Sequence, residues 1–192
     1  MAKAQPLGTV GMFKTLIKSL WWDLHRGESY RELLFKVLNI FPGESGCQIR
    51  GHFLGKLMKS AGLNTKINAG SVIYFPAGMQ IGDNFQLNTQ CVIHALGGLI
   101  CGNDVLIGPG VTIWTINHEY TDLNTPINTQ GWNRETVSIG NDVWLAANVT
   151  ILPGTHIPNG VIIGASSLVT KKDVLEPFCL YGGHPIRKIK HR

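Results

Sequence analysis

The sequence predicts a mainly β protein whose short parallel strands wind into a β-helix, preceded by a short helical cap and followed by a C-terminal segment. Three observations point to this class: an apolar residue recurs every six positions, glycine is frequent, and charged residues are few. Glycine accounts for 23 of 192 residues, or about 12% against a usual 7%. Charged residues make up 15% and hydrophobic residues 44%, a composition that excludes a disordered chain.

The six-residue repeat defines the central region and is expected to begin near Phe75. A period of six fits neither the 3.6-residue stripe of a helix nor the alternation of a long strand. It fits short strands joined by tight corners, three of which make one coil of about 18 residues that stacks on the next coil. The thirteen expected inward positions are Phe75, Ile81, Leu87, Ile93, Cys101, Ile107, Ile113, Ile139, Leu145, Ile151, Ile157, Ile163 and Val169.

The repeat is interrupted twice. Two extra residues stand around Gly97-Gly98, and 26 positions separate Ile113 from Ile139. The second interruption predicts an excursion loop over 114–138. Loops that leave a rigid scaffold commonly carry functional sites, so this loop is the first place to look for one.

The N-terminal region has a different pattern. Residues 29–32 form a capping box before an apolar stretch, which predicts a helix over about 30–41. An amphipathic stretch over 12–24 combines two tryptophans with lysines, so it is either a helical cap over the open coil end or a peripheral membrane contact. The predicted organisation is therefore a helical cap region, a β-helix and a basic C-terminal segment, at 1–60, 61–176 and 177–192.

The net charge of +5 is unevenly distributed. Residues 1–60 carry +5, residues 61–180 carry −4 and residues 181–192 carry +4. Because the body is acidic, we expect no nucleic-acid partner. The four cysteines lack zinc-site spacing, and no apolar run resembles a signal peptide or membrane span, so we expect no metal and a cytoplasmic location.

Four stretches resemble the hexapeptide-repeat acyltransferases, whose fold is a left-handed parallel β-helix. They are IGDNFQLNTQCVI, CGNDVLIGPGVTIWTINH, IGNDVWLAANVTILPGTHIPNGVIIGASSLVTKKDV and YGGHPIRKI, within about residues 75–190. Within this family the chain is most similar to sugar O-acetyltransferases of the galactoside/maltose and colanic-acid biosynthesis types. The resemblance implies a left-handed coil, acetyl-CoA as co-substrate, and a homotrimer with active sites between subunits.

His118 is the predicted catalytic residue. It stands at the start of the excursion, where the resemblance places the family's catalytic histidine, and an imidazole suits a general base near neutral pH. Asn117 and Glu119 flank it and are predicted to contact the acceptor. The resemblance also implies that Asn88 hydrogen-bonds the acceptor sugar, although an asparagine is also common at a tight corner without any such role.

The coenzyme is expected to lie along small outward residues, with cations at its phosphates. Trp144 would contact the pantetheine arm or, alternatively, a neighbouring subunit. The family commonly has glycine where Ala146 stands, which predicts a slightly tighter groove. The basic residues of this set could equally belong to a solvated tail. The predicted coenzyme-binding residues are Trp144, Ala146, Ala147, Gly164, Ala165, Ser166, Thr170, Lys171, Lys172, Arg187 and Lys188.

The predicted function is acetyl transfer from acetyl-CoA directly to a hydroxyl of a sugar or glycan precursor, with His118 as base. Two alternatives stay open: a xenobiotic (antibiotic) acetyltransferase on the same fold, and a non-catalytic β-helix scaffold. A metalloenzyme of the γ-carbonic anhydrase kind is disfavoured. It needs three converging histidines, and Leu123 stands five residues after His118.

Overall fold

The computed structural model describes Leu34 and residues 36–192. The chain divides at residue 40 into two units, and every element named below belongs to the second, Phe41–Arg192. The predicted stretch 12–24 lies outside the described residues, as does most of the helix predicted over 30–41. Of that helix, Leu34 and residues 36–38 are described and are helical.

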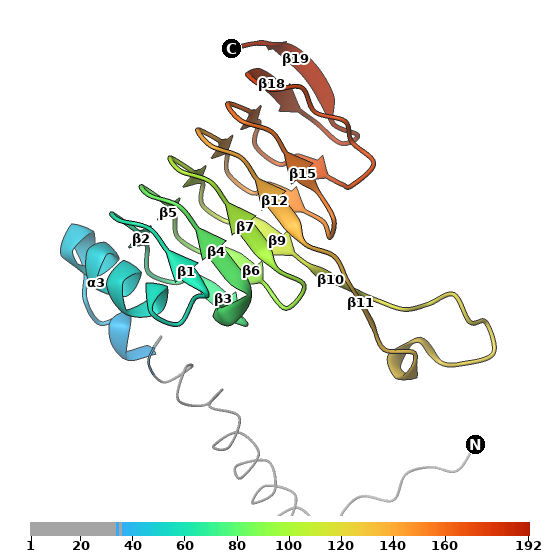
Figure 1. Ribbon diagram of the computed structural model, residues 1–192, viewed down its shortest axis with the longest axis horizontal. Coiled ribbons are helices and arrows are strands. Elements are labelled where there is room, and N and C mark those ends of the chain that lie inside the picture. The colour runs from blue at the N-terminus through green and yellow to red at the C-terminus, as the bar shows by residue number, and fades with distance from the viewer. Residues whose placement is uncertain (1–33, 35) are drawn as a thin grey trace, which may run out of the picture. The chain divides into compact units, whose positions relative to one another are not determined.

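Short strands form three sheets around one axis, and the chain visits sheets A, B and C in turn (Figure 1). Sheet A contains β1 (Ser60–Ala61), β4 (Met79–Ile81), β7 (Leu99–Cys101), β12 (Val137–Ile139) and β15 (His156–Ile157). Sheet B contains β2 (Lys66–Ile67), β5 (Gln86–Leu87), β8 (Leu106–Ile107), β13 (Trp144–Leu145), β16 (Ile162–Ile163), β18 (Cys179–Gly182) and β19 (Arg187–His191). Sheet C contains β3 (Val72–Tyr74), β6 (Val92–His94), β9 (Thr112–Trp114), β14 (Thr150–Ile151) and β17 (Leu168–Val169). This left-handed parallel β-helix confirms the predicted fold class.

The core consists of inward side chains, at least one from each of the coil strands β2–β9 and β12–β18. Twelve of the thirteen expected inward residues are buried, but Phe75 is not. It is half-buried at a corner, with a φ of 57°, just before the short 3₁₀ turn η1 (Pro76–Gly78). Ile73 on β3 takes the inward position instead, so the repeat begins earlier than predicted, in the coil formed by β1, β2 and β3.

This correction also changes the coil length. Ala61 pairs with Ile81 on the next coil, 20 residues along, because the η1 turn adds two residues at the corner between sheets C and A. The insertion around Gly97-Gly98 adds two residues at the same corner of the following coil. The expected coil of 18 residues is found further along, where Ile139 pairs with Ile157.

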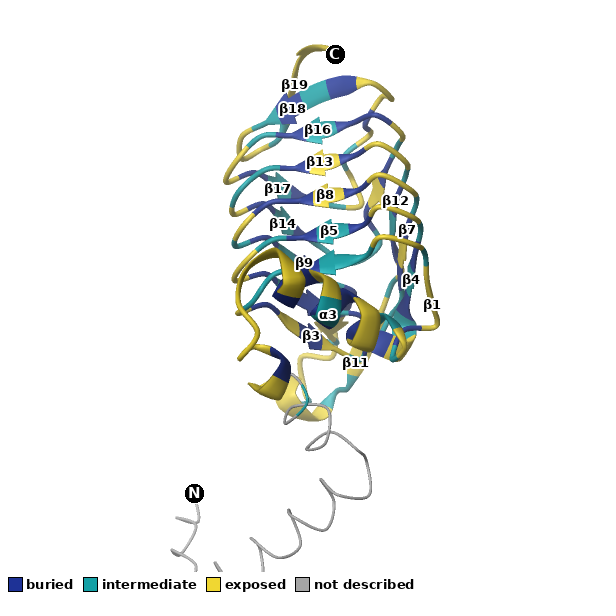
Figure 2. Cartoon of the chain, turned by 90° about the vertical axis from the view of Figure 1, so that its left-hand side faces the viewer, coloured by how far each residue is buried: buried dark blue, intermediate teal, exposed yellow. Residues whose placement is uncertain are grey.

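The first end of the coil is covered by helix α3 (Gly43–Gly55), which was not predicted (Figure 2). Its four glycines disfavour a helix in isolation. Packing explains why it forms: Gly51 lies against the backbone of Thr65, where a side chain would not fit. The buried Arg50 donates hydrogen bonds to the carbonyls of Ile67 and Phe41, at 2.7 and 2.8 Å.

The other end is covered by the last two strands. β18 pairs parallel with β16, and β19 folds back antiparallel on β18. Within the part of the chain that is described, no helix is both long and apolar enough to cross a membrane.

Candidate active site

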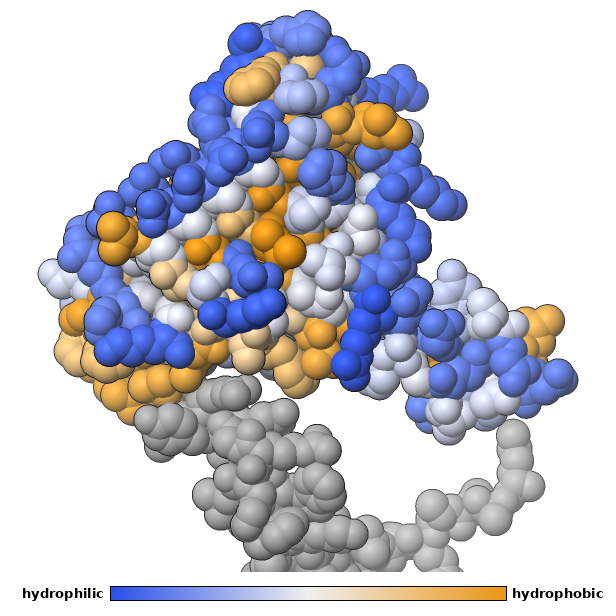
Figure 3. Space-filling view, viewed as in Figure 1, coloured by the Kyte–Doolittle hydropathy of each residue, from blue (hydrophilic) through white to orange (hydrophobic). Residues whose placement is uncertain are grey.

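The excursion between β9 and β12 is a β-hairpin rather than an irregular loop. β10 (Ile116–His118) and β11 (Trp132–Arg134) pair antiparallel, with His118 opposite Trp132. We call residues 115–136 the hairpin arm, and it projects from the corner between sheets C and A (Figure 1). Its tip carries hydrophobic side chains (Figure 3), including Leu123, which is 95% exposed.

His118 is exposed on this arm, and its orientation is set by two neighbours. Its ring lies on the indole of Trp132, with ring centroids 4.1 Å apart and planes inclined at 32°. Its backbone N–H donates to Oδ1 of Asn117 at 3.0 Å. Among the described residues none hydrogen-bonds the imidazole, so neither ring nitrogen is engaged by the protein.

The residues beside His118 support the hairpin. The side-chain oxygen of Asn117 accepts the hydrogen bond from the His118 backbone, and the N–H of Glu119 donates to the carbonyl of Gly131 at 3.1 Å. Trp132 was missed by the sequence analysis. The pairing register of β10 and β11 places Trp132 opposite His118. In the sequence, the sole indication was that an aromatic residue stands within the excursion.

Another histidine lies on the outer surface of sheet C. His94 sits in an aromatic column between Tyr74 and Trp114, which are its strand neighbours in register. Its ring stacks on Trp114 at 5.5 Å, and its Nδ1 is buried without a hydrogen-bond partner. Burial lowers the pKa of His94, which favours the neutral form of this imidazole.

The small residues predicted to contact coenzyme lie together at the corner between sheets B and C. Ala146-Ala147 follow β13, and 164–166 follow β16 on the next coil. Asn88 follows β5 at the same corner, two strands earlier in the stack, and donates its N–H to Ile107. Trp144 is 46% exposed on the outer face of sheet B, two residues before Ala146.

The predicted cationic residues lie elsewhere, and two of them are already paired. Lys171, at the corner between sheets C and A, forms an ion pair of 2.8 Å with Glu135 at the base of the hairpin arm. Lys188 pairs with Glu176 at 2.7 Å. Lys172 and Arg187 are exposed, and among the described residues neither has a carboxylate partner. Thr170 donates from its N–H and hydroxyl to Asp173.

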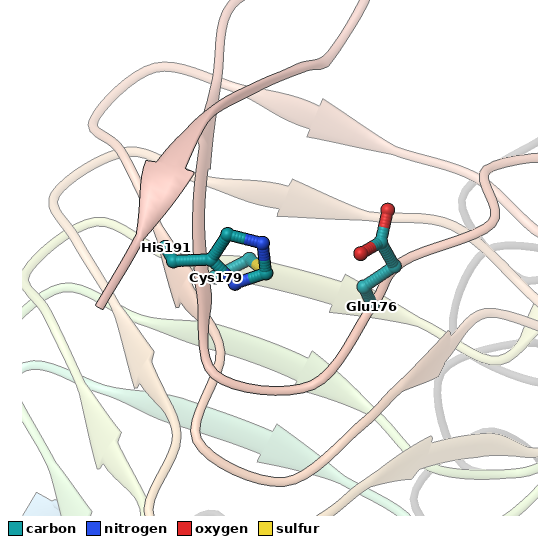
Figure 4. Close-up of side chains that lie close together, drawn as sticks. All are labelled: Glu176, Cys179 and His191. Carbon is teal, nitrogen blue, oxygen red and sulfur yellow. The ribbon is translucent and has the colours of Figure 1, made fainter.

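One cluster combines residue types that bind metals: Glu176, Cys179 and His191, near the C-terminal strand (Figure 4). The Cys179 sulfur lies 3.3 Å from Nδ1 of His191. The Lys188 ammonium contacts both of the other residues: it lies 2.7 Å from Oε2 of Glu176 and 3.1 Å from Nε2 of His191. This contact lowers the pKa of Glu176 and raises that of Lys188, so the cluster already holds a cation.

Within one chain, the predicted site residues thus form two groups. His118, Lys171 and Lys172 lie at or beyond the corner between sheets C and A, whereas Asn88 and the small residues lie at the corner between sheets B and C. The width of sheet C separates these two corners.

Comparisons with known sequences agree with this architecture. Residues 136–171 match the family described as bacterial transferase hexapeptide (six repeats). WbbJ of Escherichia coli (strain K12), named as a lipopolysaccharide biosynthesis O-acetyl transferase, is 34% identical over 134 residues, 64% of this chain and 65% of WbbJ. A chloramphenicol acetyltransferase of Klebsiella aerogenes is 48% identical over 54 residues, 28% of this chain and 25% of the relative. The chain therefore spans less than two thirds of both relatives.

Solved structures extend the similarity to the coil as a whole. A maltose O-acetyltransferase from Clostridium difficile 630 superposes with a TM-score of 0.72 at 28% identity, covering 88% of this chain and 87% of that one. A hexapeptide-repeat acetyltransferase from Vibrio cholerae, solved with acetyl coenzyme A, has a TM-score of 0.74 at 23% identity and covers 88% of both chains. At 23% identity, the similarity to the Vibrio cholerae enzyme shows that the two chains share a fold and no more.

Proposed function

Because the chain is a member of the hexapeptide-repeat, left-handed β-helix acyltransferase family, we propose that it is an acetyl-CoA-dependent O-acetyltransferase acting on a hydroxyl of a sugar or glycan precursor. The observation that carries the proposal is His118, an exposed imidazole that no described residue hydrogen-bonds, held against Trp132 on an arm outside the coil. The names of WbbJ and of the maltose enzyme support a sugar or glycan acceptor.

In the proposed reaction, His118 removes the proton of the acceptor hydroxyl while its oxygen attacks the thioester carbonyl carbon. The tetrahedral intermediate collapses, the carbon–sulfur bond breaks, and the imidazolium returns its proton to the departing CoA thiolate. No residue of the chain is acylated. Burial of all four cysteines supports this direct route, since a buried thiol is not available for acylation, and burial raises the pKa of Cys101 to about 12 and also raises that of Cys91.

The coenzyme is proposed to lie along the corner between sheets B and C. Alanine and glycine at 146, 147 and 164 let a narrow chain approach the backbone closely, and the exposed indole of Trp144 offers an apolar surface beside them. Lys172 and Arg187 are the better candidates for the phosphates, because Lys171 and Lys188 are already engaged by carboxylates. Lys172 lies at the corner between sheets C and A, the same corner as the hairpin arm, so it would meet the coenzyme of a neighbouring chain rather than that of its own.

A trimer is proposed for a geometric reason. His118 and the corner with the small residues stand on opposite sides of sheet C, and the hairpin arm points away from its own coil (Figure 1). An arm that reaches a neighbouring chain would bring His118 to that chain's coenzyme. The exposed Leu123 and Ile127 near the arm's tip give it an apolar surface for such a contact.

The test is release of free CoA from acetyl-CoA over a panel of sugars, nucleotide sugars and lipid-linked glycans. His118→Ala should lower the rate about 10²- to 10⁴-fold with the best acceptor, as expected for loss of a general base. His156→Ala is the matched control, since His156 is exposed on sheet A and bonds Ser138 rather than any residue of the arm. Wild-type turnover by His118→Ala would exclude the base assignment.

An antibiotic acetyltransferase is the second candidate, and one observation favours it. The chloramphenicol acetyltransferase of Klebsiella aerogenes shows a higher identity, 48%, although over only 54 residues. Adding chloramphenicol to the acceptor panel separates the two candidates: rapid CoA release with chloramphenicol and none with sugars would select the antibiotic.

A further inference from the structure

A groove lies where helix α3 meets the first coil, and the predicted site does not account for it. Its volume is about 770 Å³, which is within the usual range of small-molecule sites. Gln48, His52 and Lys56 line it from α3 and the residue that follows the helix, while Asn64, Lys66 and Gln86 line it from the coil.

The groove is basic. Its lining residues include two lysines and a histidine and no aspartate or glutamate, although residues 61–180 are acidic as a whole. Lys66 is paired with Glu44 at 2.6 Å. The Lys56 ammonium lies 5.7 Å from the centre of the Phe53 ring, and no carboxylate of the described residues lies within ion-pair distance of Lys56 or His52. A ligand that uses this charge must be an anion.

Amide side chains around these cations provide hydrogen bonds. Gln86 makes no side-chain hydrogen bond to any described residue, so both its donor and its acceptor are available. Asn64 donates to Asn84 at 3.0 Å, which leaves its carbonyl oxygen free to accept. Unused amide groups beside a cation suit hydroxyls next to an anionic group, as in a sugar phosphate.

The position of the groove connects it to the proposed site. Lys66 and Gln86 begin the outward column of sheet B, which continues in register through Leu106 to Trp144 (Figure 2). Neighbouring strands are about 4.8 Å apart, so Gln86 lies about 10 Å from Trp144 along this face. Asn88 follows Gln86 by two residues, which places the predicted acceptor-binding asparagine between the groove and the predicted coenzyme path.

We propose that this groove binds the phosphate-bearing end of the acceptor, and therefore that the acceptor is a phosphorylated sugar. The inference rests on the proposed function and specifies its substrate class. The phosphate binds near Lys56 and His52, Gln86 and Asn64 bond hydroxyls, and the sugar reaches toward Asn88. A neutral sugar would leave the cationic end of the groove unused.

Binding to the full chain without acetyl-CoA tests the inference, using glucose 1-phosphate, UDP-glucose, glucose and inorganic phosphate in isothermal titration calorimetry. At least one of the two phosphorylated sugars should bind more tightly than glucose and phosphate. Lys56→Gln should weaken that binding about tenfold, the loss expected for one charge-assisted contact. Lys59→Gln is the matched control, because Lys59 is exposed nearby and does not line the groove.

Three outcomes would overturn the inference: neither phosphorylated sugar binds, phosphate alone binds as tightly, or both lysine variants lose the same affinity. The result is independent of the general-base test. His118→Ala should keep the binding and lose CoA release. If Lys56→Gln binds normally while His118→Ala is inactive, the groove assignment fails and the proposed function stands; if His118→Ala is active, the base assignment fails whatever the groove binds.

Discussion

The coil and the hairpin arm are built differently although they are continuous in sequence. In the middle of the coil a strand buries a side chain such as Ile107 or Leu145, and its backbone is paired with the coils before and after. The arm has one two-stranded ladder, and most of its residues are exposed. The coil can therefore fix positions but offers few free polar groups, whereas the arm presents His118 but depends on the coil for its place. Substitutions in the two regions should have separable effects.

The largest effect on stability should come from the core of the coil. Ile107→Ala removes a fully buried side chain and should lower the free energy of unfolding by about 2–5 kcal/mol. Ile100→Ala is the control, since Ile100 points outward from the preceding strand and is 43% exposed. Denaturant unfolding of both variants measures the difference, and equal losses would contradict the assigned inward and outward positions.

The next effect separates orientation from stability in the arm. Trp132→Ala removes the ring on which His118 rests and should lower kcat about tenfold, with little change in the free energy of unfolding. Trp132→Phe keeps an aromatic surface and should restore most of the rate. If the phenylalanine variant is as slow as the alanine variant, ring stacking does not position His118.

A smaller effect is expected for the two neighbouring lysines. Lys172→Gln should raise KM for acetyl-CoA about fivefold, as expected for a surface charge worth about 1 kcal/mol, and leave KM for the acceptor unchanged. Lys171→Gln should change KM for acetyl-CoA less, because Glu135 already engages that ammonium. Steady-state kinetics of both variants measures KM for acetyl-CoA. Equal KM values in the two variants would contradict the different roles given to Lys172 and Lys171.

The smallest effect concerns pH and the aromatic column of sheet C. Because burial lowers the pKa of His94, the unfolded chain takes up a proton that the folded chain resists. Stability should therefore fall as pH drops through the ordinary histidine value of 6.5. His94→Phe should flatten the stability profile between pH 7 and 5, and an unchanged slope would show that other groups cause it.

The β-helix was predictable because its core repeats at a fixed spacing. The start of the repeat was not, because Phe75 is apolar at the expected position while the η1 turn shifts the register by two residues. Helix α3 was missed because its four glycines favour packing against the coil over helix formation alone. Its structure depends on tertiary contacts that no local pattern reveals.

The candidate site was predictable only in part for a related reason. A residue type indicates what chemistry is available, so His118 and the small corner residues could be selected from the sequence. Ion pairs between residues far apart in sequence cannot be predicted from local patterns. Lys171 pairs with Glu135 and Lys188 pairs with Glu176, across 36 and 12 positions. The stacking of Trp132 on His118 likewise required the hairpin register.

The most direct test of the division between coil and arm compares His118→Ala with Ile107→Ala in the same two measurements. We predict that His118→Ala unfolds at the wild-type denaturant concentration and releases CoA at least about 100-fold more slowly. Ile107→Ala should unfold earlier yet keep the wild-type rate per folded molecule. A His118→Ala protein that turns over the best acceptor at the wild-type rate would contradict the account.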